Sequence, residues 1–257
     1  MKRNGMTLLQ TSAGEVRIFD NVGDLSRAAA SWFVDLANEA VRNHEAFRVA
    51  LSGGSTPKKL YSLLATPEIS MRIPWRAVHL FWGDERCVPP DDPESNYGMV
   101  RDALLQSVPV PPTNVHRIRG EIDPVQAAAE YEAVLHKSFG DAPNKVPRFD
   151  LVLLGLGEDG HTASLFPGTS ALNENERLAV ALYVEKLKAY RISLTLPVIN
   201  QGAVVAFLVA GGGKRSIVTR VLGDSGERAE FPAERVRPTE GKLIWFLDMQ
   251  AAAEISP

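Results

Sequence analysis

The chain contains the stretch FDLVLLGLGEDGHT at residues 149–162. Its first six residues, from Phe149 to Leu154, are nearly all apolar and end at a glycine-rich turn. Such a run is typical of a parallel β-strand that is covered on both faces. We therefore expect a buried strand here, followed by a loop.

Strand and helix patterns alternate on both sides of this stretch. Further strands are predicted at residues 47–51, 78–82, 115–118, 178–184, 191–196, 204–209 and 243–247. Helices are predicted at residues 24–41, 57–64, 96–105, 124–139 and 214–222. This alternation predicts an α/β fold with a mostly parallel sheet and helices on both faces. Residues 223–238 are polar and are expected to form a loop. Since no linker divides the chain, we expect a single domain over residues 1–257.

The composition argues against several classes of protein. The formal net charge of −3 disfavours a nucleic-acid surface, because such domains usually carry a strong basic excess. The longest apolar run, Ala203–Ala210, is far shorter than the roughly 20 residues that cross a bilayer, and the first residues do not resemble a secretory signal. Cys87 is the only cysteine, so no intrachain disulfide can form, and it lacks a partner at zinc-ligand spacing. We expect a cytoplasmic protein that binds neither nucleic acid nor membrane.

The loops after the strands are the candidate sites, because ligands of open α/β sheets bind at the carboxyl ends of the strands. After the strand at 47–51 the chain reads Ser52-Gly53-Gly54-Ser55-Thr56-Pro57. Two glycines allow positive φ angles, and Thr56 and Pro57 are typical of a helix start. The free N–H groups of such a start bind anions, most often phosphate. A plain strand–turn–helix connection explains the loop equally well.

Charged residues follow three other strands or begin them. Asp84 and Arg86 come after the strand at 78–82. Asp84 could exchange a proton with a sugar, and Arg86 could bind phosphate through its planar guanidinium. Lys214 follows three glycines at a helix start and Arg191 begins a strand, so both are candidate anion contacts. Ordinary surface charge is the alternative for all four residues.

Residues 155–160 match the Gly-x-Gly-x-x-Gly pattern of dinucleotide-binding loops. Glu158 and Asp159 would repel a pyrophosphate, and Pro167-Gly168 would cut short the helix that should follow. The alternative is an acid–histidine unit, in which His161 exchanges protons near neutral pH and Asp159 positions it. A histidine that merely caps a short helix is a further possibility.

These loops together resemble the 6-phosphogluconolactonase family, which is related to the glucosamine-6-phosphate deaminases. The resemblance rests on ordered stretches over about residues 51–222: Ser52 to Pro57, Trp82 to Arg86 with Ser95-Asn96-Tyr97, and Gly155 to Pro167. The segment from Thr162 to Pro167 is of the lactonase type rather than the deaminase type. The resemblance implies a Rossmann-like α/β sandwich.

The resemblance also implies roles for individual residues. His161 would be the general base that activates water, with Asp159 and Asp84 close by. The groups that would bind the sugar phosphate are Ser52, Gly53, Gly54, Arg191 and Lys214, assisted by Arg86. The implied reaction is hydrolysis of 6-phospho-D-glucono-1,5-lactone to 6-phosphogluconate in the oxidative pentose phosphate pathway, with no metal and no organic cofactor. A monomer or small homo-oligomer is expected.

Three alternatives remain open. An isomerase and deaminase of glucosamine 6-phosphate would use Asp84 to abstract a proton from C2. A sugar-phosphate sensor would bind its ligand without hydrolysing anything. A dinucleotide-dependent enzyme would bind NAD at residues 155–160.

Overall fold

A computed structural model describes residues 2–3, 6–140, 146–223 and 231–255 of the chain. Its main sheet has nine strands in the order β1-β2-β3-β12-β11-β8-β4-β5-β7. All neighbours from β3 to β7 in this order are parallel, whereas β1, β2 and β3 pair antiparallel. The strands are β1 (Lys2–Arg3), β2 (Met6–Thr11), β3 (Gly14–Phe19), β4 (Phe47–Leu51), β5 (Val78–Trp82), β7 (Val115–His116), β8 (Leu151–Leu154), β11 (Val204–Val209) and β12 (Lys242–Asp248). The mostly parallel sheet is therefore confirmed.

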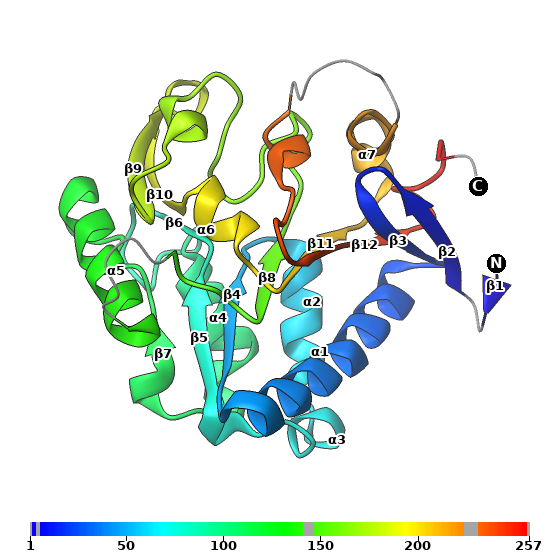
Figure 1. Ribbon diagram of the computed structural model, residues 1–257, viewed down its shortest axis with the longest axis horizontal. Helices are drawn as coiled ribbons and strands as arrows, with labels where there is room; N and C mark the ends of the chain where they lie inside the picture. Colours follow the sequence, from blue (N-terminus) through cyan, green and yellow to red (C-terminus); the bar gives the residue numbers. More distant parts are fainter. Residues whose placement is uncertain (1, 4–5, 141–145, 224–230, 256–257) are drawn as a thin grey trace.

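Helices cover both faces of this sheet, as predicted. The α1 and α2 helices lie on one face, and α6 and α7 lie on the other (Figure 1). The helices are α1 (Val22–His44), α2 (Ser55–Leu64), α3 (Pro67–Ser70), α4 (Asn96–Ala103), α5 (Pro124–Phe139), α6 (Leu196–Asn200) and α7 (Arg215–Leu222). All four side chains of β8 are buried, which agrees with its apolar sequence. Within the described residues, no helix is long and apolar enough to span a membrane.

A second, antiparallel sheet departs from the prediction. It contains β6 (Asp84–Arg86), β10 (Ala189–Leu194) and β9 (Ala179–Val184), in that order. The last two strands were expected within the parallel sheet. Only residues 185–188 connect them, and so short a connection allows antiparallel pairing alone. Gly83 joins the two sheets: its N–H donates to the Leu51 carbonyl at 2.8 Å, and its carbonyl accepts from the Leu194 N–H at 2.8 Å.

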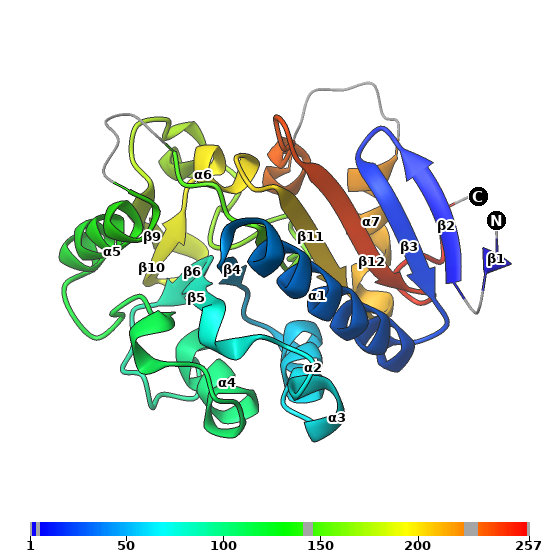
Figure 2. The ribbon, with the colours of Figure 1, turned by 60° about the horizontal axis from the view of Figure 1, so that its bottom comes forward.

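The sequence patterns also missed the hairpin of β2 and β3 at the N-terminal end (Figure 2). The side chains of β2 are partly or fully exposed, and polar residues interrupt its apolar pattern. Predicted element ends differ from the observed ones by a few residues elsewhere. The predicted loop at 223–238 contains a short 3-10 helix at Pro232–Arg235, and its residues 224–230 lie outside the described residues.

Candidate active site

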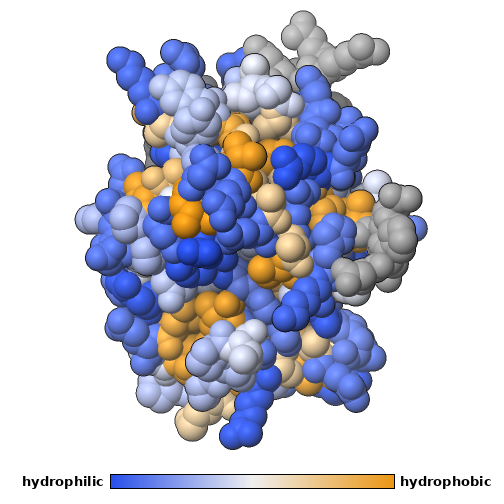
Figure 3. Space-filling model, turned by 90° about the vertical axis from the view of Figure 1, so that its left-hand side faces the viewer, coloured by the Kyte–Doolittle hydropathy of each residue, from blue (hydrophilic) through white to orange (hydrophobic). Residues whose placement is uncertain are grey.

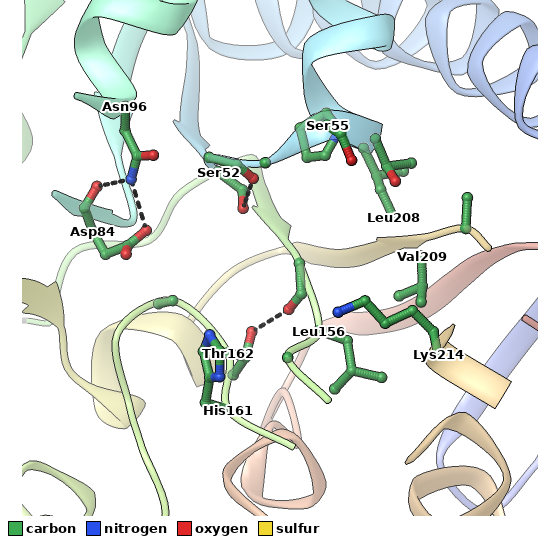
Figure 4. A pocket seen from close by; sticks show the side chains of 18 of the residues that line it. Ser52, Ser55, Asp84, Asn96, Leu156, His161, Thr162, Leu208, Val209 and Lys214 are labelled. Atoms are coloured by element: carbon green, nitrogen blue, oxygen red, sulfur yellow. Dashed lines mark hydrogen bonds between the residues drawn. The ribbon is translucent and has the colours of Figure 1, made fainter. Parts of the chain in front are cut away.

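A cavity of about 230 Å³ opens at the carboxyl ends of the parallel strands. Segments that follow β4, β5, β8 and β11 line it, so four separate parts of the sequence meet there (Figure 4). The predicted site residues on its wall are Ser52, Gly53, Gly54, Asp84, Arg86, His161 and Lys214. The other two, Asp159 and Arg191, lie beside residues of this wall and do not line the cavity.

The loop at Ser52–Gly54 is fixed by backbone contacts. The Ser52 N–H donates to the Tyr61 hydroxyl at 3.0 Å, and this hydroxyl donates to the Ser52 carbonyl at 2.8 Å. Gly54 has a φ of 104°, and a Cβ on Gly53 would lie 1.9 Å from Oδ1 of Asn96. The positive φ favours glycine at position 54, and a side chain at position 53 would displace Asn96 from its contacts with Asp84. The loop leads directly into α2, whose first N–H groups have no partner within the helix and can bind an anion.

The two neighbouring carboxylates after β5 point in different directions. Asp84 lines the cavity, and its Oδ2 accepts from the Ser164 hydroxyl at 2.6 Å. Its Oδ1 lies 3.3 Å from the amide nitrogen of Asn96. The Glu85 carboxylate instead accepts from the N–H groups of Asn96 and Tyr97, both at 2.7 Å. Burial raises the pKa of Glu85, although these hydrogen bonds oppose the shift. Glu85 therefore anchors the start of α4, and Asp84 faces the cavity.

Three cationic side chains lie at or next to the cavity: Arg86, Lys214 and Arg191. Arg86 and Lys214 line the cavity, and Arg86 donates to the Glu94 carbonyl at 2.6 Å. Arg191 is the cross-strand partner of Arg86 between β6 and β10. Burial, reinforced by the Arg86 charge, lowers the pKa of Arg191. The paired guanidinium groups thus form a positive region that favours an anionic ligand.

The His161 ring is held by groups on two sides. Its Nδ1 lies 2.5 Å from Oδ1 of Asp159, and the Phe166 ring stacks on it with 4.2 Å between centroids. A Cβ on Gly157 would lie 2.0 Å from Nδ1, so a glycine is required under the ring. Since the carboxylate accepts the proton on Nδ1, we assign Nε2 as the nitrogen that is free to accept a proton.

The electrostatic surroundings keep this ring neutral. Burial lowers the pKa of His161 to about 4, the nearby Asp84 charge opposes this shift, and Lys214, Arg86 and Arg191 reinforce it. A neutral imidazole predominates at pH 7, which a general base requires.

The loop around His161 is closed by its own hydrogen bonds. The Gly157 N–H donates to the His161 carbonyl at 2.8 Å, and the Gly160 N–H donates to the Gly157 carbonyl at 3.0 Å. The Thr162 hydroxyl donates to the Gly155 carbonyl at 2.9 Å. Turns and a bridge between Thr162 and Leu165 follow instead of a helix. The loop therefore lacks the helix start that a dinucleotide pyrophosphate would need.

The family of glucosamine-6-phosphate isomerases/6-phosphogluconolactonase matches residues 20–245. The chain belongs to this family. A 6-phosphogluconolactonase of Nostoc sp. is 43% identical over 218 residues, covering 84% of this chain and 88% of the relative. That of Synechocystis sp. is 43% identical over 210 residues, covering 81% and 85%. The structure of 6-phosphogluconolactonase from Trypanosoma brucei is similar with a TM-score of 0.82 at 30% identity, covering 97% of this chain and all of that one.

The sequence patterns of this family member did not predict a role for two polar residues of the site, Asn96 and Ser164. Asn96 and Ser164 each contact one oxygen of the Asp84 carboxylate, Oδ1 and Oδ2 respectively. Asn96 also donates to the Asp84 carbonyl at 3.0 Å and packs on Gly53. A signal for Asn96 existed: Ser95 is an N-cap residue, and Asn96 begins the helix that it caps.

The other histidines and Cys87 of this family member have different surroundings. Nδ1 of His79 lies 3.2 Å from Nε2 of His116, and the His116 ring stacks on Phe81 with 4.3 Å between centroids. Nε2 of His44 contacts Asp150 at 3.0 Å. Burial raises the pKa of Cys87 to about 11, so its thiol stays protonated at pH 7. Among the described residues, no group of three or more His, Cys, Asp and Glu is placed to bind a metal ion.

Proposed function

We propose that this chain hydrolyses 6-phospho-D-glucono-1,5-lactone to 6-phosphogluconate. The observation that supports this most directly is a neutral, oriented imidazole on the same cavity as a glycine-rich anion loop and two cations. Close relatives over most of the chain are named 6-phosphogluconolactonases. A lactone is an activated ester, so attack by water needs only a base, an anion-stabilising group and an orienting grip on the phosphate.

The proposed step begins with a water molecule next to the lactone carbonyl. Nε2 of His161 accepts a proton from this water, and the hydroxide attacks the carbonyl carbon. The tetrahedral intermediate collapses when the bond to the ring oxygen breaks. The same imidazolium returns its proton to that oxygen, which leaves as the C5 hydroxyl. General acid–base assistance of this kind contributes about 10²–10⁴-fold.

The remaining residues bind and orient the substrate in this proposal. The backbone of Ser52–Gly54 and the start of α2 receive the phosphate, together with Lys214 and Arg86. Arg191 adds positive charge from the strand next to Arg86. Asp159 fixes the His161 ring, and Asp84 stabilises the imidazolium that forms during the step. Binding energy from the phosphate, which is remote from the reacting carbon, orients the ring for attack.

The test is acid release from freshly prepared 6-phosphogluconolactone, measured with a pH indicator and corrected for spontaneous opening. We expect rapid saturable acid release by the wild-type chain and background release by His161→Gln. His136→Gln, which changes a histidine on α5, is the matched control and should hydrolyse normally. Absence of wild-type hydrolysis would contradict the proposal. Ammonia release from glucosamine 6-phosphate would indicate the deaminase reaction instead.

We also infer that the chain acts as a single α/β domain in the cytoplasm, as a monomer or small homo-oligomer. One family match spans residues 20–245, and the lone Cys87 leaves no intrachain disulfide. Size-exclusion chromatography with light scattering tests the oligomeric state.

A further inference from the structure

The tip of the hairpin of β9 and β10 contacts the loop that carries His161. A 3-10 turn at Glu185–Leu187 and Lys188, whose φ is 47°, connect its two strands. The hairpin belongs to the small sheet that Gly83 joins to the main sheet, and α5 packs on it. The side of the molecule that carries α5 and this hairpin is mainly hydrophilic, with separate hydrophobic patches (Figure 3). On the tip, Lys186 points to the loop of His161.

Lys186 contacts both groups that hold the His161 ring. Its Nζ forms an ion pair with Oδ2 of Asp159. The other oxygen of the same carboxylate, Oδ1, contacts Nδ1 of His161. Nζ of Lys186 also lies 4.7 Å from the centroid of the Phe166 ring, a distance typical of a cation–π contact, and Phe166 stacks on His161. The Lys186 ammonium group therefore contacts two neighbours of the His161 ring, Asp159 and Phe166, and does not line the cavity.

We propose that Lys186 is a positioning residue for the lactone hydrolysis: it holds the Asp159 carboxylate against His161 and limits the negative charge that the ring experiences. This inference rests on the proposed function. A carboxylate with one oxygen on a lysine and the other on an imidazole has a fixed orientation, and it stabilises the imidazolium less than a lone carboxylate does.

The other charges that face His161 set the background for this effect. Asp84 favours the protonated ring, and Lys214, Arg86 and Arg191 disfavour it. Lys186 acts in the same sense as these cations, but through Asp159. Because half of the Lys186 side chain is exposed, solvent screens its charge and the expected effect is modest.

Two substitutions should change the histidine in opposite directions. In Lys186→Met, Asp159 keeps its full charge next to the ring, so the imidazolium is favoured and the ring is protonated at higher pH. In Asp159→Asn, the charge is lost, so the imidazolium is disfavoured and the ring is protonated at lower pH. A purely structural role for Lys186 predicts no such opposition, because loosened packing lowers turnover without moving the pH at which it is lost.

The experiment measures kcat/KM for the lactone against pH and, in the same proteins, the His161 ring signal by NMR titration. We expect Lys186→Met to move the acid limb upward by about half a pH unit, with KM nearly unchanged. Lys186→Arg should stay at the wild-type position. Asp159→Asn should move the limb downward, and the double variant should match Asp159→Asn alone.

Lys188→Asn is the matched control. It removes the same charge from the same turn, and asparagine tolerates the left-handed backbone there. Its profile should overlay the wild type. A Lys186→Met profile that overlays the wild type, or that moves in the direction of Asp159→Asn, would overturn the inference. If the wild type does not hydrolyse the lactone, the proposed function fails, and the NMR titration still decides the role of Lys186.

Discussion

Two histidine sites in this protein have similarly low basicity and different surroundings. Burial lowers the pKa to about 4 for His161 and for His116 alike. His161 turns Nδ1 to a carboxylate and borders the cavity. His116 turns Nε2 to a second imidazole, that of His79, and stacks on Phe81. A lowered pKa therefore records burial. Catalysis additionally needs an unoccupied nitrogen next to a space where substrate fits.

The charges around the two sites support this distinction. At His116, the neighbouring charges of His79 and Arg48 both add to the effect of burial. At His161, an opposing carboxylate on Asp84 stabilises the imidazolium. A catalytic base must accept a proton and then return it, so a site with both signs of charge suits the reaction better than a purely cationic one.

The sharpest test of this comparison replaces each of the two histidines by glutamine in a separate variant. His161→Gln should lose about 10²–10⁴-fold in kcat, because the base is removed. His116→Gln should keep kcat within about twofold, because His116 lies outside the cavity. The lactone assay gives both values. A large loss in His116→Gln with unchanged thermal stability would contradict the assignment.

The next largest effect is expected for Lys214, which lines the same cavity as His161. Lys214→Met should raise KM by about 10–100-fold, because a charged contact to phosphate is worth about 1.5–3 kcal/mol. It should also move the acid limb of kcat/KM upward, since the Lys214 charge helps to keep the ring neutral. Steady-state kinetics at several pH values measure both changes. Lys58→Met, on the exposed side of α2, serves as the control and should change neither.

A smaller change in activity is expected at Ser164, which binds the Asp84 carboxylate. Ser164→Ala removes a hydrogen bond of 2.6 Å from a buried charged group. We expect kcat/KM to fall by about tenfold, since such a bond is worth about 1.5 kcal/mol. Ser164→Thr keeps the hydroxyl and tests whether the bond or the available space matters. Equal activity of Ser164→Ala and wild type would show that Asn96 alone positions Asp84.

The contact between His79 and His116 should affect the stability of the fold rather than the activity. The folded-state pKa of His116 is lowered, so the unfolded chain binds more protons between about pH 6.5 and pH 4. The stabilisation is complete above about pH 6.5 and is lost as the pH falls through that window. Because the ring is only partly buried, we expect a loss on the order of 1 kcal/mol. Urea unfolding at pH 7 and pH 5 should show a smaller difference for His116→Gln than for the wild type.

Much of the site could be predicted because its parts follow parallel strands. The Ser52–Gly54 loop, Asp84, His161 and Lys214 each come after a predicted strand, and parallel strands bring their carboxyl ends to one edge. The contact from Ser164 to Asp84 spans 80 residues of sequence, and no local pattern encodes it. The small sheet was missed because strand patterns do not specify the partner strand. The ion pair between Lys186 and Asp159 depends on that sheet and could not be predicted from the sequence either.

Two tyrosines anchor the backbone at the start of two loops that line the pocket. The Tyr131 hydroxyl accepts from the Trp82 N–H at 2.9 Å and donates to the Trp82 carbonyl at 2.8 Å. The Tyr61 hydroxyl does the same at Ser52. In each case one phenolic oxygen takes the place of an adjoining β-strand at the point where the chain leaves β4 or β5. Both loops thus start from an anchored residue. The binding of a sugar phosphate therefore loses less conformational entropy than it would if these loops had to be ordered first.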